Sequence, residues 1–273
     1  MGKGMRVVVF GASGAVGRFL QPLLREAGAT LTMLSRRQDA GNDGAEWVQG
    51  TLPDRVPQLP PCDAVICLGP LDHFASWLQR AALDDGTRIV ALSSMSAESK
   101  RDAPLAAERE LSARLRASET RLADICRQRA LPWTVLRATL IYGGGDDRSL
   151  TPLARMAVRW RIFPLPAGRG LRQPIHARDL AAAVHAAWQS REGAGLLEAG
   201  GGERLPARAM FARVRASLAC RTLPLPLPRT VLKLAAAVRP GLRGMLARLD
   251  QDLVADNRAL ESRLGVRPGP FRP

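Results

Sequence analysis

Continuous apolar runs alternate with amphipathic stretches through the first half of the chain. Residues 5–10 (MRVVVF) are apolar and β-branched, with one cation, which is typical of a strand buried on both faces. Residues 11–28 begin in a glycine-rich turn and then place apolar side chains from Val16 to Leu24 at helical spacing. Residues 29–37 begin as another strand-like run. The order strand, glycine-rich turn, helix, strand predicts a βαβ unit.

The same alternation continues to about residue 142. Further strands are predicted over 46–49, 63–69, 87–93 and 133–141, and helices over 73–83 and about 104–130. Strands that alternate with helices are joined by crossovers, which gives parallel strands with helices on both faces. The predicted fold class is therefore α/β, a Rossmann-type doubly wound parallel sheet.

The pattern changes after Gly143, where glycine and proline become frequent. We expect a loop over 143–149, a Gly- and Pro-rich stretch over 163–174, a helix over 179–190, a strand and turn over 195–203, an extended linker over 223–228, and helices over 229–262 broken at Pro240. The expected division is a Rossmann core over 1–142 and a mixed region over 143–273. That region returns a helix and a strand to the core and forms a small C-terminal substrate lobe over the carboxyl edge of the sheet, where such folds bind ligands.

The glycines of the first turn have the spacing of a dinucleotide-binding turn. They form GASGAVG between a predicted strand and a predicted helix. The first glycine permits the tight bend, the second admits a pyrophosphate, and the third lets helix and strand pack closely. Free N–H groups at the helix start favour a phosphate. We predict that the pyrophosphate of a dinucleotide binds Gly11, Ala12, Ser13, Gly14, Ala15, Val16 and Gly17.

The end of the second predicted strand indicates which dinucleotide binds. An acidic residue there would bind the ribose 2′-hydroxyl of NAD(H), but the chain has Ser35, Arg36 and Arg37. Two guanidinium groups suit a 2′-phosphate, because each can form bidentate hydrogen bonds with it. The sequence therefore favours NADP(H), with NAD(H) as the alternative.

The chain carries an excess of positive charge. It has 40 Lys plus Arg against 25 Asp plus Glu in 273 residues, a formal net charge of +15, and the excess falls after residue 100. This charge predicts an anionic small-molecule substrate, with a solvated Arg-rich surface as the plainer alternative. Nucleic acid is disfavoured, because few aromatic residues are interleaved with the basic ones.

Two other features concern location and partners. Residues 229–249 interleave apolar residues with cations, which predicts either peripheral contact with an anionic membrane or a pair of helices packed on the sheet. The sequence contains no uncharged apolar run of about 18 residues, so no membrane span is predicted. Four cysteines without a CxxC pair and three isolated histidines predict reduced thiols, a cytoplasmic location and no metal site.

Five segments together resemble one enzyme superfamily. They are VVVFGASGAVGRFL, DAVICLGP, IVALSSMS, WTVLRATLIYGGG and LRQPIHARDLAAAV. On these segments the chain resembles the short-chain dehydrogenase/reductase superfamily, in its extended and atypical, NAD-dependent epimerase/dehydratase-like branch. The resemblance covers nearly the whole chain, and it implies a Rossmann fold that binds a nicotinamide cofactor.

The resemblance also implies roles for single residues. Ser94 corresponds to the active-site serine. The remaining cofactor positions are Leu68, Gly69 and Pro70 on the nicotinamide side, Ser93 beside them, and Thr51 and Leu52 near the adenine. The implied substrate positions are Met95, Ser96, Arg137 and His176, and structural hydrogen bonds are the alternative role for Arg137 and His176.

The family's Tyr-x-x-x-Lys pair is missing from this chain. In redox-active members the tyrosine acts as acid or base and the lysine lowers its pKa, from one face of a helix. Residues 101–130 contain neither Tyr nor Lys, and the one tyrosine, Tyr142, ends a predicted strand. Lys100 is our catalytic candidate beside Ser94; the other charged candidates are Glu108, Arg109 and Glu119.

Two classes of function follow from these features. The first is an NADP(H)-dependent oxidoreductase or epimerase-like enzyme acting on an anionic substrate that is phosphorylated or linked to a nucleotide. The second is a non-catalytic NADP(H)-binding protein, similar to the NmrA-like sensors or to the accessory Rossmann subunit of respiratory complex I. The missing Tyr–Lys pair favours the second class, and the oligomeric state stays open in both.

Overall fold

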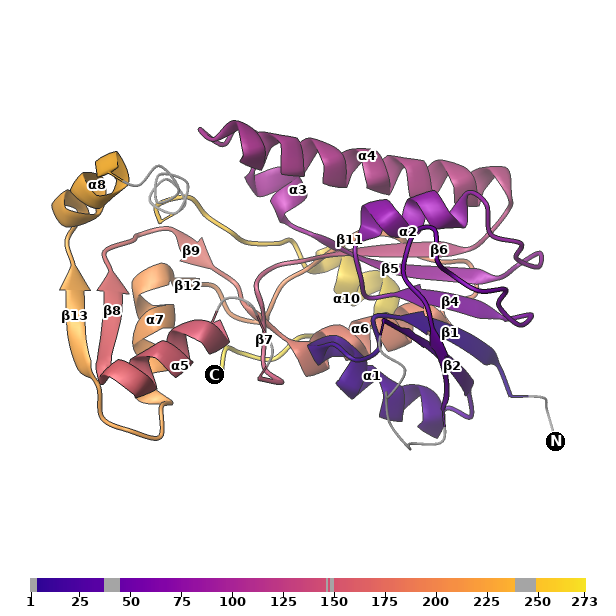
Figure 1. The fold of residues 1–273 in the computed structure, drawn as a ribbon, viewed down its shortest axis with the longest axis horizontal. Coiled ribbons are helices and arrows are strands. Elements are labelled where there is room, and N and C mark those ends of the chain that lie inside the picture. The colour runs from indigo at the N-terminus through magenta and orange to yellow at the C-terminus, as the bar shows by residue number, and fades with distance from the viewer. Residues whose placement is uncertain (1–3, 37–44, 146, 148–149, 239–248) are drawn as a thin grey trace.

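One parallel sheet forms the centre of the computed structural model, which describes residues 4–36, 45–145, 147, 150–238 and 249–273 (Figure 1). Its strands are β1 (Arg6–Phe10), β2 (Thr30–Ser35), β3 (Glu46–Gln49), β4 (Ala64–Cys67), β5 (Arg88–Ser94), β6 (Trp133–Ala138) and β11 (Gly195–Ala199). They pair in the order β11-β6-β5-β4-β1-β2-β3, and each pair is parallel. The chain winds outward in both directions from β1 and β4, so the predicted doubly wound Rossmann fold is confirmed.

Helices cover both faces of the sheet (Figure 1). One face carries α1 (Ala15–Glu26), α6 (Ala177–Gln189) and α10 (Arg258–Leu264); the other carries α2 (Leu71–Leu78) and α4 (Ala106–Gln128), and the short α3 (Ser96–Ser99) packs on α4. Alternate residues of β1 enter the two layers, because side chains of a strand alternate between its faces. Val9 packs in the cluster that contains Leu20 of α1, whereas Phe10 packs in the cluster that contains Phe74 of α2.

A smaller lobe stands beside the carboxyl edge of the sheet, on the left in Figure 1. Its elements are α5 (Leu150–Trp160), β8 (Ile162–Pro166), β9 (Leu171–Arg172), β12 (Leu205–Pro206), α7 (Ala207–Ala216), β13 (Leu223–Leu227) and α8 (Arg229–Val238). The short pair β7 (Ile141–Tyr142) and β10 (Ile175–His176) lies between lobe and sheet. The lobe has its own apolar core, in which Phe163 packs with Met210 and Phe271.

The segment expected to be an extended linker over 223–228 is extended, but it is a paired strand and not a linker. Residues Leu223–Leu227 form β13, which runs parallel to β8. The Leu223 N–H donates to the Arg161 carbonyl over 2.8 Å. Leucine and proline alternate, so the leucine amides share one edge and the prolines, which lack an N–H, share the other. A strand with this pattern pairs on one side only.

The expectation of helices over 229–262 is wrong in its middle part. Helices cover Arg229–Val238 and Arg258–Leu264, and residues 239–248, which include the predicted break at Pro240, lie outside the described residues. The chain from 249 to 257 is not helical, and its Leu253 forms a parallel bridge with Arg172 of β9 instead. The Asp252 carboxylate accepts from the Leu171 N–H over 2.7 Å, and the Leu253 N–H donates to the Leu171 carbonyl over 2.9 Å. These bonds to another strand replace helical ones.

Candidate functional site

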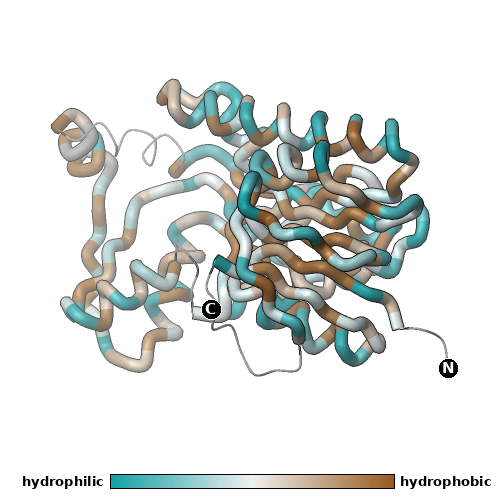
Figure 2. Tube along the Cα trace, turned by 45° about the vertical axis from the view of Figure 1, so that its right-hand side comes forward, coloured by the Kyte–Doolittle hydropathy of each residue, from teal (hydrophilic) through white to brown (hydrophobic). Residues whose placement is uncertain are grey.

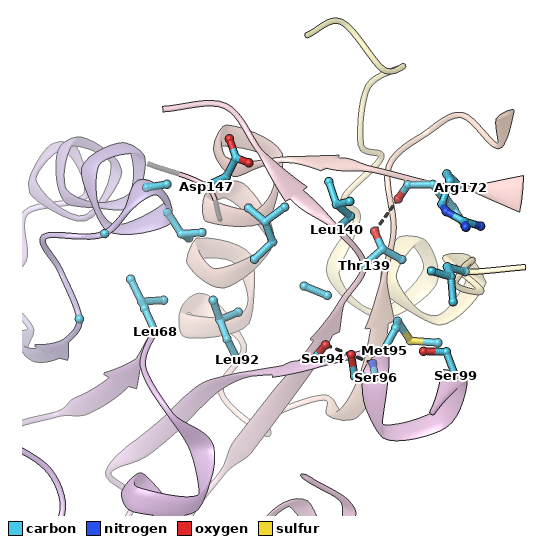
Figure 3. A pocket seen from close by; sticks show the side chains of 18 of the residues that line it. Leu68, Leu92, Ser94, Met95, Ser96, Ser99, Thr139, Leu140, Asp147 and Arg172 are labelled. Carbon is cyan, nitrogen blue, oxygen red and sulfur yellow. Dashed lines mark hydrogen bonds between the residues drawn. The ribbon is translucent and has the colours of Figure 1, made fainter. Parts of the chain in front are cut away.

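A cavity of about 510 Å³ lies at the carboxyl edge of the sheet, beside the ends of β1 and β4 (Figure 3). Its wall combines the turn after β1 with the ends of β4, β5 and β6. Ser96 and Ser99 of α3, Arg172 of β9 and Leu253 complete it. The order of the strands reverses between β1 and β4, and doubly wound sheets bind their ligands at such a switch point. The cavity therefore occupies the expected ligand position of the fold.

The glycine turn forms one end of the cavity. Gly11 has a positive φ of 78°, and a Cβ there would lie 3.2 Å from the Gly69 nitrogen. A Cβ on Gly17 would lie 2.0 Å from the Ala12 carbonyl oxygen, so this glycine is required for α1 to pack on β1. A Cβ on Gly14 would meet only the Gly11 carbonyl oxygen, at 3.4 Å. The missing side chain at Gly14 therefore leaves its space to the cavity rather than to the protein.

The start of α1 fits an anion. Its N-cap, Gly14, has no side chain to bond the first N–H groups, and the first turn has no acidic residue. Unpaired N–H groups and the positive end of the helix dipole attract phosphate oxygens. Among the residues predicted to hold the cofactor, Gly11, Gly14, Ala15, Val16, Gly17 and Leu68 line the cavity. Ala12 is buried beneath the turn and Ser13 is exposed beside it.

The remaining predicted cofactor positions lie outside the cavity wall. Ser35 and Arg36 follow one another at the end of β2, with Ser35 half-buried and Arg36 exposed, and Arg37 lies outside the described residues. Thr51 and Leu52 lie in a tight turn closed by the Thr51 N–H and the Arg55 carbonyl, 2.7 Å apart. Gly69 and Pro70 join β4 to α2, where Pro70 is the N-cap.

The end of β5 brings several polar groups to the cavity. Ser94, Met95, Ser96, Ser99 and Lys100 all line it. The Ser96 N–H donates to Ser94 Oγ over 3.1 Å (Figure 3). Lys100 Nζ lies 3.4 Å from Glu108 Oε1, which joins the end of α3 to the start of α4. The predicted catalytic pair, Ser94 and Lys100, is therefore brought to one cavity.

Ser93 and Arg137 lie on the other face of the sheet, against α4. Ser93 Oγ donates to Glu119 Oε1 over 2.5 Å, and Arg137 Nη2 lies 2.6 Å from Glu119 Oε2. Arg137 Nη1 also contacts Glu98 Oε1 at 2.8 Å. The hydrogen bond with Glu119 is the main reason that the pKa of Arg137 is raised. Neither residue lines the cavity; both belong to a buried polar network behind it.

His176 and Tyr142 pack together between the sheet and the lobe. Their ring centroids are 5.0 Å apart, and Phe19 lies on His176 at 5.5 Å. His176 Nδ1 accepts from the Arg178 N–H over 3.0 Å and caps α6; burial lowers the pKa of its imidazole. The Tyr142 hydroxyl accepts from the Arg272 N–H over 3.0 Å, and burial raises its pKa. Neither ring lines the cavity.

Several lining residues did not follow from the sequence pattern. Arg172 is only 6% exposed and lines the cavity from β9. Its Nη1 donates to the Leu171 and Gln251 carbonyls over 2.8 Å each, and burial is the main cause that lowers its pKa. Asp147 also lines the cavity, and its Oδ1 accepts from the Leu150 N–H over 2.6 Å. The one sequence feature that could have pointed to Arg172 was its place in the LRQP segment before His176.

Gln173 ties the cavity wall to three distant parts of the chain. Its side-chain Nε2 donates to the Gly201 carbonyl over 2.7 Å, and its Oε1 accepts from the Ala255 N–H over 2.8 Å. Its backbone carbonyl accepts from Thr139 Oγ1 over 2.5 Å (Figure 3). Each side-chain polar atom of this buried residue therefore has a partner.

A family model described as NAD(P)H-binding matches residues 11–152. The chain belongs to this NAD(P)H-binding family. The match begins at Gly11, the first glycine of the turn, and extends through the ends of β4, β5 and β6 that line the cavity. The predicted nicotinamide dinucleotide is confirmed as a class, and the glycine turn fits its pyrophosphate. No curated protein sequence matches the chain significantly.

Solved structures of nucleotide-sugar enzymes share the fold over nearly the whole chain. UDP-N-acetylglucosamine 4-epimerase from Bacillus cereus has a TM-score of 0.71 at 18% identity, over 98% of this chain and 95% of that chain. MoeE5 in complex with UDP-glucuronic acid and NAD has a TM-score of 0.74 at 18% identity, over 97% and 94%. dTDP-glucose 4,6-dehydratase from Bacillus anthracis str. Ames has a TM-score of 0.69 at 12% identity, over 98% and 93%. The resemblance to the epimerase/dehydratase-like branch is confirmed in the fold.

Two absences hold for the part of the chain that the structure describes. None of its His, Cys, Asp and Glu side chains gather in threes in a way that could hold a metal ion. Within the same residues, each helix is too short or too polar to cross a bilayer.

Proposed function

We propose that the protein is an NADP(H)-dependent oxidoreductase or epimerase-like enzyme that acts on an anionic small molecule. The observation that carries this proposal is one cavity that joins the glycine turn to Ser94, Lys100 and Arg172. A dinucleotide bound at the turn and a substrate held by the three polar side chains would share that space. The two ligands of a hydride transfer must meet in this way.

The cofactor would be held along the carboxyl edge of the sheet. Residues 11–17 would bind the pyrophosphate, and Leu68, Gly69 and Pro70 would lie on the nicotinamide side. Ser35, Arg36 and Arg37 would bind the 2′-phosphate, which is why NADP(H) is preferred over NAD(H). Thr51 and Leu52 would border the adenine. When bound, the nicotinamide supplies or accepts a hydride.

Ser94 and Lys100 would act on the reacting oxygen of the substrate. The Ser96 N–H occupies one lone pair of Ser94 Oγ, so the hydroxyl proton is left for a substrate oxygen. Lys100 carries an ammonium at the same wall, oriented by Glu108. It would donate a proton to a developing alkoxide or stabilise its charge, the task for which related enzymes use a tyrosine. Met95 and Ser96 would border the substrate.

Arg172 supports an anionic substrate. It is a buried cation in the cavity wall, and its desolvation leaves it well placed to attract a phosphate or carboxylate. MoeE5 is known in complex with UDP-glucuronic acid, which carries a diphosphate and a carboxylate. We therefore place phosphorylated and nucleotide-linked sugars first among the substrates to be tested.

A second candidate is a protein that binds NADP(H) without catalysis. The observation that favours it is α4, which contains no tyrosine or lysine and contributes no described residue to the cavity wall. A positioned acid–base group contributes roughly 10²–10⁴ in rate, so its loss without a substitute would slow turnover by about that factor. Under this candidate Ser94 and Lys100 only border the cofactor.

Thermal unfolding with NADPH, NADP, NADH and NAD in turn tests the cofactor. A ligand at about 100 Kd adds about 2.7 kcal/mol to the free energy of unfolding. We expect the phosphorylated pair to stabilise more, and Arg36→Ala/Arg37→Ala to remove that difference while Arg191→Ala leaves it intact. NADPH turnover with UDP-sugars and sugar phosphates then separates the candidates, because binding without turnover supports the second.

A further inference from the structure

The lobe presents large apolar side chains to solvent along its outer edge. Trp160 at the end of α5 is 66% exposed, Leu223 of β13 is 71% exposed, and Leu234 of α8 is 73% exposed. The other members of this edge are Ile162, Leu225, Val231 and Val238. β13 is the outermost strand of the lobe, and apolar stretches of α8 and β13 are brown in Figure 2. We call these seven residues the lobe edge.

Two long described stretches of the lobe carry cations and no carboxylate. Among the residues that the structure describes, 150–178 contain six arginines and 204–238 contain six arginines and one lysine, and neither stretch contains an Asp or Glu. Exposed Lys233 lies between Leu232 and Leu234 on α8 itself. A surface that combines exposed apolar side chains with an excess of cations differs from ordinary solvated surface, where charges of both signs are mixed.

Three of these arginines surround a hollow next to the lobe edge. Arg161, Arg215 and Arg221 line a space of about 590 Å³ that is also bordered by Leu223. Arg215 is oriented by a hydrogen bond of 3.2 Å from its Nη1 to the Thr222 carbonyl. Guanidinium groups bind phosphate oxygens in bidentate geometry, so the hollow fits a phosphate group with apolar matter beside it.

We propose that the lobe edge docks onto an anionic phospholipid surface. The apolar side chains would enter the boundary between headgroups and acyl chains, Trp160 at the interface depth that tryptophan prefers, and the three arginines would bind headgroup phosphates. A second copy of the chain fits this edge less well, since a two-fold contact would bring cations against cations without a carboxylate between them. Nucleic acid fits less well because aliphatic side chains dominate the edge. The proposal is independent of the reaction.

Vesicle sedimentation of the full chain tests this proposal. The probes are vesicles of phosphatidylcholine alone and vesicles that mix phosphatidylcholine with phosphatidylglycerol. We expect binding to the anionic vesicles only, weakened by salt. Arg221→Gln should lower the partition coefficient about fivefold, the effect of one cation near such a surface. Trp160→Ser/Leu223→Ser/Leu234→Ser should lower it more than about tenfold.

Matched controls lie far from the lobe edge. Arg191→Gln removes an exposed cation after α6, and Leu196→Ser removes an exposed leucine of β11. Both should bind vesicles as the unmodified protein does, and thermal unfolding should show that every variant is folded. Equal binding to neutral and anionic vesicles, no binding to either, or equal loss in the control variants would overturn the proposal. So would a dimer in sedimentation velocity that only the lobe-edge variants dissociate, or salt-sensitive binding to duplex DNA without binding to vesicles.

Discussion

Ser93 and Ser94 are neighbours on β5, and their side chains lie on opposite faces of the sheet. Ser93 Oγ donates to the buried carboxylate of Glu119 on α4, whereas Ser94 lines the cavity. The period of two along a strand produces this division. The end of β5 therefore connects a buried ionic network with the candidate catalytic wall through one peptide bond.

Arg137→Met should destabilise the protein by about 3–5 kcal/mol, because it leaves the Glu119 carboxylate buried without its cation. Urea denaturation measures this change. Arg137→Met/Glu119→Leu should recover much of the loss, since it removes both charges. A substrate role for Arg137 would give the opposite result, namely a raised KM with little change in the free energy of unfolding.

Lys100→Met should lower kcat by about 10²-fold or more if Lys100 serves as the acid of the reaction. Dissociation of NADPH should change little, because the pyrophosphate is held by the glycine turn. Lys233→Met is the matched control, since it removes the exposed lysine of α8, far from the cavity. Equal kcat in the Lys100→Met variant and the unmodified protein would exclude the role. A variant with a changed pH profile and intact NADPH binding would support it.

Gly14→Ala and Gly17→Ala should separate ligand binding from stability. Ala at 17 would place its Cβ 2.0 Å from the Ala12 carbonyl oxygen, so we expect a destabilisation of about 1–3 kcal/mol or more. Ala at 14 meets only one backbone atom at 3.4 Å and keeps an ordinary extended backbone, with φ of −78°. Its unfolding should change by less than about 0.5 kcal/mol. Its Kd for NADPH should rise more than about tenfold, because the methyl group enters the space left for the pyrophosphate.

The buried cysteines should make the protein sensitive to alkaline pH. Burial raises the pKa of Cys62 to about 11 and of Cys67 and Cys126 to about 12, from 9.0. The unfolded chain releases these protons first, so the folded state binds more protons above pH 9 and loses stability as pH rises. The stabilisation is complete below pH 9, and between pH 9 and about pH 11 each thiol contributes a loss of about 1.4 kcal/mol per pH unit.

Urea denaturation from pH 8 to pH 11 measures this slope. Cys67→Ser/Cys126→Ser should flatten it, with a lower stability at pH 8 from the buried hydroxyls. In the folded protein at pH 8 iodoacetamide should label Cys220, which is half-buried, before the three buried thiols. Rapid labelling of Cys67 would show that β4 opens more readily than its packing indicates.

The sheet followed from the sequence because local pattern determines it. The apolar run of β1 and the glycines at the start of α1 fix a strand, a turn and a helix without reference to the rest of the chain. Ser94 and Lys100 are near in sequence, and one short helix brings both to the cavity. Arg172 could not be found in this way, because its place in the wall depends on Gln251 and Leu253, about 80 residues later.

Local sequence pattern did not predict two segments of the lobe correctly. Prolines in the segment LPLPLP argue against a strand only where both edges pair, and β13 pairs with β8 alone. Likewise, the apolar residues between 249 and 257 resemble a helix pattern, but the carboxylate of Asp252 bonds to β9. Hydrogen bonds to strands distant in sequence determine the conformation of both segments. The periodicity of apolar residues reflects only interactions between residues near in sequence.

The bonds of Gln173 set how wide the cavity is before any ligand enters. One buried amide and its backbone carbonyl hold Thr139, Gly201 and Ala255 together, so the sheet and the lobe meet at a fixed distance there. A hinge at this point would have to break several buried hydrogen bonds at once. The entropy of bringing the two walls together is therefore lost when the chain folds and not when a ligand binds, so less of the binding free energy is spent on closing the cavity.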